Sequence, residues 1–210
     1  FLKWLELSIM MVLFPVIIVI YNLQIFVIPI IIFASIISYF YLIKKNYNFK
    51  LSNLENKKQI KHICIRFLFI SSFIAFFSYY FLPEKFLIFP YLNFKLWVFV
   101  IFLYPFLSAL PQEVFFRAFF FERYTFLFKN KKFLILFNGL FFGITHSIYL
   151  NIFVLILAFI GGIIFSINYY YNKSIFLVTV EHALLGNFIF TIGLGHYFEY
   201  SIIKHIYNLL

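Results

Sequence analysis

Residues 7–43 read LSIMMVLFPVIIVIYNLQIFVIPIIIFASIISYFYLI, and this stretch decides the fold class of the protein. It contains no charged side chain, and only the polar break YNLQ at residues 21–24 divides it. A membrane-spanning helix needs about 20 mostly apolar residues. The stretch therefore predicts two spanning helices joined by a tight turn. Pro15 and Pro29 are compatible with this prediction, because membrane helices tolerate proline kinks.

The rest of the chain has the same apolar character. Of its 210 residues, 65% are hydrophobic and 11% are charged, whereas soluble domains average about 45–50% apolar and about 25% charged residues. Six further apolar runs predict spans, at residues 67–82, 94–110, 112–128, 133–150, 151–172 and 175–192. We expect an all-α fold, a polytopic membrane helix bundle with about eight transmembrane helices, in which residues 1–210 form a single integral-membrane domain.

Basic residues give the chain a formal net charge of +10 and predict its orientation. The most basic loop, residues 44–66, is expected in the cytoplasm by the positive-inside rule, and the N-terminus with it. If every predicted segment crosses a cell membrane, however, the basic cluster at residues 129–132 falls on the opposite side. The basic residues gather in short loops, which favours the lipid bilayer as a partner and argues against nucleic acid.

What the sequence lacks excludes one hydrolytic mechanism and weighs against others. All seven acidic residues are Glu and none is Asp, so a paired-aspartate intramembrane protease is excluded. The chain has no His-Glu-x-x-His zinc motif, and no Gly-x-Ser-x-Gly turn for a serine nucleophile. The single Cys64 allows no disulfide within the chain.

The first concentration of polar groups within the apolar runs is Gln112-Glu113, followed by Arg117. Ionisable side chains inside a membrane helix are costly, and each is therefore a candidate for function. Glu113 and Arg117 are four residues apart and share one helix face, so we expect them to pair. Pro111 suits the first position of a helix, which would place Glu113 in the first turn, where backbone N–H groups favour a carboxylate.

Two further concentrations lie downstream. Gly139 and Gly143 form a small-x-x-x-small seam that lets another helix approach closely, and His146 follows on nearly the same face. His182 and Gly186 also share a face, so the glycine leaves room beside the imidazole.

Two neighbours of this last pair lie on other faces of the helix. Asn187 points away from His182 and can join it only if the helix bends or the cavity is wide. Glu181 also points elsewhere, and we expect it to pair with a Lys or Arg. Taken singly, each of the three concentrations is also typical of ordinary contacts between helices.

Taken in order, Glu113-x-x-x-Arg117, Phe142-x-x-x-His146 and His182 followed by Asn187 resemble the CPBP family of intramembrane proteases, which includes the type II CAAX prenyl endopeptidases. The resemblance covers residues 112–187 and implies a family core at about 94–192. It implies an endopeptidase that cleaves a membrane-associated protein or lipidated peptide. Two positions depart from the family pattern: Gln112 stands where the first of two Glu is usual, and Gly186 where Asn or Asp is usual.

The resemblance also implies a mechanism. Glu113 would act as general base on a water held by His146 and His182, and Asn187 or the amide of Gln112 would donate to the oxyanion. A zinc ion held by Glu113, His146 and His182 is the alternative, and the sequence leaves the choice between zinc and no cofactor open.

Two other classes compete with the protease. The missing first Glu favours a catalytically degenerate scaffold or binding protein that uses the same cavity without cleavage. A small transporter would be expected to show paired repeats with broken helices, and the sequence has no such symmetry.

The abundance of Phe, Ile, Asn, Lys and Tyr fits an A+T-rich genome and thus a bacterial source.

Overall fold

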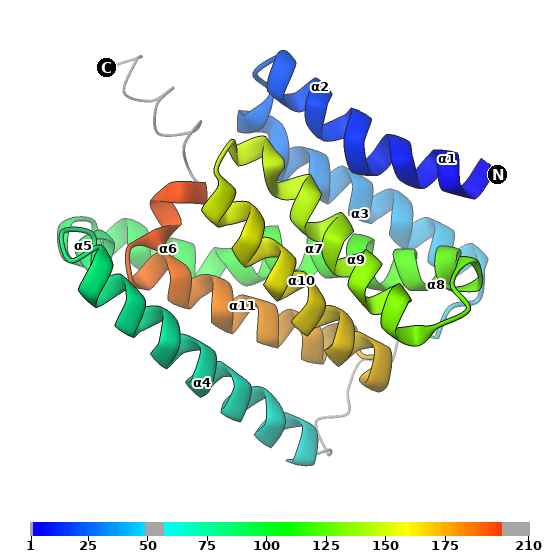
Figure 1. Cartoon of the computed structure of the whole chain (residues 1–210). Coiled ribbons are helices and arrows are strands. Elements are labelled where there is room, and N and C mark those ends of the chain that lie inside the picture. Colours follow the sequence, from blue (N-terminus) through cyan, green and yellow to red (C-terminus); the bar gives the residue numbers. More distant parts are fainter. Residues whose placement is uncertain (1, 49–56, 199–210) are drawn as a thin grey trace.

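The computed structural model describes residues 2–48 and 57–198, and every regular element in these two ranges is helical (Figure 1). The first elements are α1 (Leu2–Ser8), the π-helical turn η1 (Ile9–Leu13), α2 (Phe14–Ile20), the 3-10 turn η2 (Gln24–Phe26), α3 (Val27–Lys44) and α4 (Lys57–Phe81). The middle elements are α5 (Ile88–Leu92), α6 (Phe94–Tyr104), the π-helical turn η3 (Pro105–Ala109), α7 (Leu110–Glu113), the π-helical turn η4 (Val114–Phe119), α8 (Phe120–Tyr124) and the 3-10 turn η5 (Thr125–Leu127). The last elements are α9 (Lys131–Thr145), the 3-10 turn η6 (His146–Tyr149), α10 (Ile152–Asn172), α11 (Ile175–Thr191) and the 3-10 turn η7 (Leu194–Phe198).

These elements form a bundle in which several helices are long enough to span a membrane. Six helical segments of the described chain are long and apolar enough to cross a membrane: Leu2–Ile20, Gln24–Lys44, Lys57–Phe81, Phe94–Leu127, Lys131–Tyr149 and Ile152–Asn172. α11 is a shorter apolar helix of 17 residues. The predicted all-α polytopic bundle is confirmed, but the predicted count of eight spans is not.

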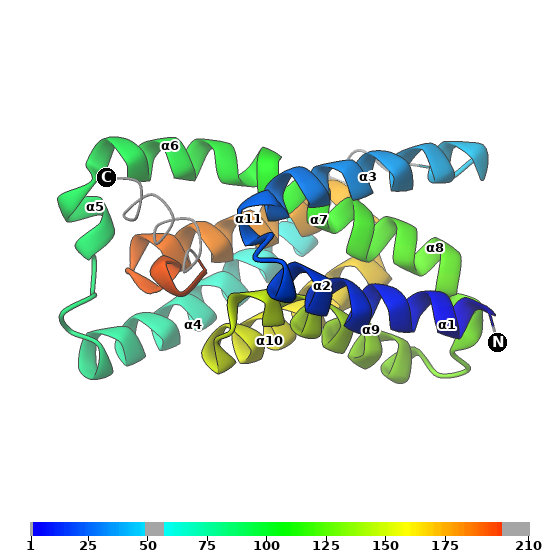
Figure 2. The same cartoon turned by 90° about the horizontal axis from the view of Figure 1, so that it is seen from above.

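The predicted division of residues 94–128 into two spans is wrong. From α6 to η5 the chain forms one helical segment of 34 residues, which runs across the molecule in Figure 2. Pro111 lies inside this segment, and the carbonyl four residues before it belongs to Leu107 in η3. A proline normally breaks a helix because its ring clashes with that carbonyl. The wider π-helical turn relieves the clash, so Glu113 lies mid-helix and not in a first turn as predicted.

One crossing at 94–127, in place of the two predicted, would put both basic clusters on the same side of a membrane. The C-terminal end of α3, the start of α4 and the turn between α8 and α9 lie at the same end of the bundle (Figure 1). α4 begins at Lys57 and not near residue 67 as predicted, so the second part of the predicted basic loop is helical. Residues 49–56 of that loop, and the tail 199–210, lie outside the described residues.

The predicted glycine seam is confirmed as the contact between α9 and α10. A Cβ atom at Gly139 would lie 2.5 Å from Ile163 Cγ1, and one at Gly143 would lie 2.9 Å from Phe159 Cβ. On the other helix, a Cβ atom at Gly162 would lie 2.9 Å from the Gly139 carbonyl oxygen. The two backbones therefore approach more closely than any larger residue allows, and this holds His146, which follows α9, near the centre of the bundle.

The outer surface of the bundle is apolar. Large side chains such as Phe69 and Phe102 are 77% and 69% exposed, and contiguous apolar surface of this kind is unusual on a soluble monomer. Lipid covers such a surface in a bilayer, so the fold is that of a multi-pass membrane protein.

The expected pairing of Glu181 is also confirmed, because its Oε1 lies 2.7 Å from Arg66 Nε.

Candidate active site

Three of the predicted site residues come from the helical segment that contains both π-helical turns η3 and η4. Gln112 and Glu113 end α7, which lies between these turns, and Arg117 lies within η4. Such turns are frequent at functional sites, because the extra residue in a turn changes the direction of the side chains around it. Here the two consecutive residues differ in burial: Gln112 is half-buried, whereas Glu113 is completely buried.

Glu113 is the centre of a buried charge cluster. Its Oε1 accepts a hydrogen bond of 2.7 Å from His182 Nδ1, and its Oε2 lies 3.2 Å from Arg117 Nε. Glu113 and Arg117 both have 0% exposure. The predicted pairing of these two residues is therefore confirmed, and His182 is a second partner of the same carboxylate.

Arg117 is held by aromatic rings as well as by charge. Its guanidinium carbon lies 4.6 Å from the centre of the Phe142 ring and 5.6 Å from that of Phe165. Within the described residues, none of its three nitrogens has a hydrogen-bond acceptor of good geometry. Ring faces attract cations, but among the described residues only the Glu113 carboxylate, at 3.2 Å, neutralises the charge.

His182 is fixed on both ring nitrogens and on its face. Phe165 stacks on the imidazole with 4.5 Å between ring centres, and Nε2 lies 3.0 Å from the Tyr104 hydroxyl oxygen. A carboxylate only accepts hydrogen bonds, so Nδ1 carries a proton. In the neutral ring, Nε2 is then the acceptor and Tyr104 the donor.

His146 differs from His182 in how its ring nitrogens are engaged by the protein. Its Nδ1 donates a hydrogen bond of 2.7 Å to the backbone carbonyl of Phe142, so Nε2 of the neutral ring is an acceptor. The Phe142 ring lies against both imidazoles, with 4.5 Å between ring centres to His146 and 5.8 Å to His182. One aromatic residue thus positions both candidate histidines.

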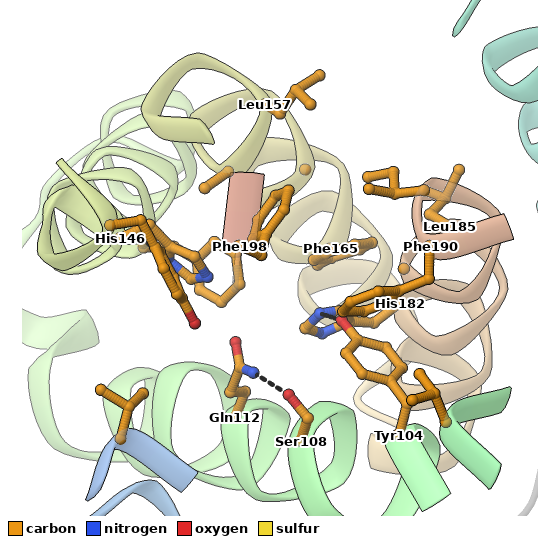
Figure 3. Close-up of a pocket in the computed structure, with 18 of the residues that line it drawn as sticks. Tyr104, Ser108, Gln112, His146, Leu157, Phe165, His182, Leu185, Phe190 and Phe198 are labelled. Atoms are coloured by element: carbon orange, nitrogen blue, oxygen red, sulfur yellow. Dashed lines mark hydrogen bonds between the residues drawn. The ribbon is translucent and has the colours of Figure 1, made fainter. Parts of the chain in front are cut away.

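A cavity of about 340 Å³ brings three of the predicted residues together. Gln112, His146 and His182 line it, with Tyr104 and Ser108, and Figure 3 shows these side chains around the same space. The amide of Gln112 donates a hydrogen bond of 2.8 Å to Ser108 Oγ, and its Oε1 has no hydrogen-bond partner in the described chain. Gln112 and His146 also line a second cavity of about 250 Å³.

The other three predicted residues are not among those that line either cavity. Glu113 and Arg117 lie behind His182 in the buried cluster described above. Asn187 donates a hydrogen bond of 3.0 Å to the carbonyl of Ile101 and so ties α11 to α6. Asn187 therefore does not join the other predicted residues at the cavity.

The proposed zinc ligands do not form a metal site in this arrangement. Among residues 2–48 and 57–198, no three His, Cys, Asp or Glu side chains gather closely enough to hold a metal ion. The Glu113 carboxylate and the His182 Nδ1 face each other in a hydrogen bond, and the His146 Nδ1 is bound to a carbonyl. In this arrangement the donor set does not fit a zinc ion.

Sequence reasoning missed Tyr104, Ser108 and Phe165. A tyrosine or phenylalanine in a membrane helix is usually a packing residue, and the chain has 16 Tyr and 36 Phe, so composition does not distinguish these two. The one signal was Gly186, which was expected to leave room beside His182. Tyr104 occupies that room.

Comparison with known proteins identifies one family. Residues 93–189 match the family described as Type II CAAX prenyl endopeptidase Rce1-like. This range contains the positions of all six predicted site residues. No curated protein and no solved structure matches the chain.

Proposed function

The chain belongs to the CAAX-protease-like family of type II prenyl endopeptidases, and we propose on this premise that it hydrolyses a peptide bond within the membrane. The observation that carries the proposal is the cavity, in which Gln112, His146 and His182 face one space inside a bundle of membrane-spanning helices. Hydrolysis needs a base, a water molecule and a group that stabilises the oxyanion. The cavity offers polar atoms for all three among largely apolar walls.

We assign water activation to His146. Its Nδ1–H is held by a backbone carbonyl, so the lone pair of Nε2 is available to a water in the cavity. Glu113, the base expected from the sequence, has both oxygens engaged by His182 and Arg117, and it does not line the cavity. A positioned general base commonly contributes about 10²–10⁴-fold to a rate, which makes His146 a measurable contributor.

Glu113 serves in this proposal as a positioning residue. Its carboxylate fixes the tautomer and the orientation of His182 through the 2.7 Å hydrogen bond, as the carboxylate of a catalytic triad does for its histidine. Arg117 compensates the carboxylate charge, so the cluster behind the cavity is close to neutral. His182 then holds Nε2 in a fixed direction, 3.0 Å from the Tyr104 hydroxyl oxygen at the cavity wall.

The substrate is a membrane-associated protein or a lipidated peptide. The cavity walls are mostly Leu, Ile, Val and Phe side chains from membrane-spanning segments, and an apolar chain enters such a space from the bilayer at low cost. We place the protein in a cell membrane with residues 44–66 in the cytoplasm, because the basic segments share one end of the bundle.

A non-cutting relative is the second candidate, and one observation favours it. No acidic side chain lines either cavity among the described residues, and Gln112 is an amide at the cavity surface. A scaffold or binding protein would hold a lipid or an apolar peptide there without hydrolysis. The two candidates share a fold and differ only in turnover.

The first experiment compares the termini of membrane proteins by mass spectrometry. Three cultures make the native protein, His146→Ala or His62→Ala at matched abundance. His62 is exposed on α4 and lies outside the cavity, so it controls for loss of a histidine. New termini in the native and His62→Ala cultures that vanish with His146→Ala support an endopeptidase. Identical termini in all three, with folded protein present, support the scaffold.

A second experiment separates the candidates at Gln112. Gln112→Glu restores a carboxylate at the cavity surface. If the native protein produces no new termini and Gln112→Glu produces them, the natural chain is a binding protein on a hydrolytic fold. If the native protein cleaves and Gln112→Glu stops cleavage, the amide belongs to a working site.

A further inference from the structure

Tyr104 is the last residue of α6, and its side chain reaches the candidate site. It lies outside every motif identified from the sequence. Its hydroxyl lies 3.0 Å from His182 Nε2, and its ring lines the same cavity as Gln112 and His146. We propose that Tyr104 is a catalytic residue, the donor that stabilises the oxyanion of the peptide substrate. The proposal rests on the proposed function, because it names a group for that same hydrolysis.

Gly186 makes this position of Tyr104 possible. A Cβ atom at residue 186 would overlap the phenol of Tyr104, with the hydroxyl oxygen among its nearest atoms. The two residues come from different helices, α6 and α11, and only one of them can fill the space beside the imidazole. Any side chain at 186 would therefore displace the hydroxyl from His182. The glycine and the tyrosine act as a pair.

The two donors expected from the sequence are engaged elsewhere. Asn187 donates to the Ile101 carbonyl and does not line the cavity. The amide of Gln112 donates to Ser108. Tyr104 lies at the cavity wall and its ring packs on Phe190, with 5.4 Å between ring centres, which holds the phenol in place. A fixed donor of this kind stabilises developing charge without reorganisation.

The hydrogen bond between Tyr104 and His182 has two arrangements. With a neutral imidazole, the hydroxyl donates to Nε2. With a protonated imidazole, which the ion pair with Glu113 accommodates, Nε2–H donates to the phenol oxygen. The phenolic proton is then directed to a third partner in the cavity, and a substrate carbonyl oxygen is the partner that hydrolysis provides.

The step balances with water as the only co-reactant. His146 Nε2 takes a proton from water while the water oxygen bonds to the carbonyl carbon. The π pair of the carbonyl moves onto its oxygen, which accepts the hydrogen bond from Tyr104. That pair then re-forms the carbonyl, the C–N bond breaks, and the leaving nitrogen takes the proton from His146. His182 keeps both of its ring protons and Tyr104 keeps its own proton throughout the step.

The test uses Tyr104→Phe, which removes one oxygen atom and keeps the ring. Tyr91→Phe is the matched control, since Tyr91 is 85% exposed and is not among the residues that line the cavity. The measured quantity is the rate at which new termini of the cell's own membrane proteins accumulate after induction, per folded protein. Loss of one oxyanion donor costs about 10²–10³-fold, so we expect a fall of that size for Tyr104→Phe and none for Tyr91→Phe.

The outcomes separate this proposal from the proposed function. A fall of tenfold or more supports Tyr104 as the donor, and a smaller one overturns that role while leaving the endopeptidase intact. If the native protein releases no termini, the proposed function fails, and the role of Tyr104 fails with it.

If Tyr104→Phe does not fold, a second pair of variants tests the proposal by moving the donor from α6 to α11. Tyr104→Ala empties the space, and adding Gly186→Asn places an amide donor in it from α11, one helical turn from His182. Faster cleavage by the double variant than by Tyr104→Ala supports the proposal. Equal rates overturn it.

Discussion

Arg117 is a buried cation with one oppositely charged partner in the part of the chain that the structure describes, and the loss of either charge should therefore be costly. Removing one member of a buried ion pair costs about 3–5 kcal/mol, because the other charge stays uncompensated, whereas replacing both is often neutral. We therefore expect Arg117→Met and Glu113→Gln each to lower the free energy of unfolding by about 3–5 kcal/mol. The double variant should recover most of this loss. Unfolding by SDS in mixed micelles, followed by tryptophan fluorescence, measures the three changes.

The same variants separate stability from catalysis. The double variant has no carboxylate to orient His182, so it should stay inactive although it is stable. Lys3→Met is the control, because Lys3 and Glu6 form a pair at 3.1 Å with both side chains 32% exposed. Such a pair contributes less than about 1 kcal/mol. A double variant as unstable as the single variants, or one that cleaves like the native protein, would contradict this account.

The contact between α9 and α10 depends on which glycine faces the partner helix. Gly161 and Gly162 are neighbours on α10, yet a Cβ atom at 162 would lie 2.9 Å from the backbone oxygen of Gly139, whereas one at 161 would meet only two Phe165 ring atoms, at 3.4 and 3.6 Å. Overpacking costs about 1–3 kcal/mol, while alanine gains about 1 kcal/mol over glycine in a helix.

We expect Gly162→Ala to destabilise the protein relative to Gly161→Ala by about 1–3 kcal/mol. Gly161→Ala itself should be neutral or stabilising. The SDS titration described above measures both free energies of unfolding. Equal values for the two variants would show that the helices can separate without cost, against the close packing in the structure.

The elements and the site differ in how far they could be predicted. Long apolar runs require helices in lipid, and spacing of four residues places two side chains on one helix face. The bundle, the Glu113–Arg117 pair and the glycine seam were therefore accessible from the sequence. The uninterrupted helix at 94–127 was not, because Pro111 and Gln112 have the composition of a helix start, and only packing selects the π-helical turn that absorbs the proline.

The position of the acid within the site was also out of reach. Adjacent residues on a helix point about 100° apart, so Gln112 and Glu113 could not both face the cavity. The sequence does not say which one does. The structure places the amide at the cavity and the carboxylate in the buried cluster, and it adds a tyrosine from a helix with no motif. These features depend on how helices distant in sequence meet.

The uninterrupted helix at 94–127 also determines which ends of the bundle share a side of the membrane. With one crossing there, the turn before α9 lies with the basic ends of α3 and α4, and α5 lies at the opposite end (Figures 1 and 2). Cytoplasmic loops are rich in Lys and Arg. The arrangement therefore predicts the turn before α9 inside the cell and α5 outside.

Single cysteines test this orientation, because Cys64 is the only native one. In a Cys64→Ser background, Tyr91→Cys and Lys131→Cys place one thiol at each end, at positions that are exposed in the structure. A membrane-impermeant maleimide should label Tyr91→Cys in intact cells, and Lys131→Cys only after permeabilisation. The reverse pattern would overturn the predicted orientation and keep the crossing. Labelling of both thiols from the same side would contradict the crossing itself, since an odd number of spans must separate them.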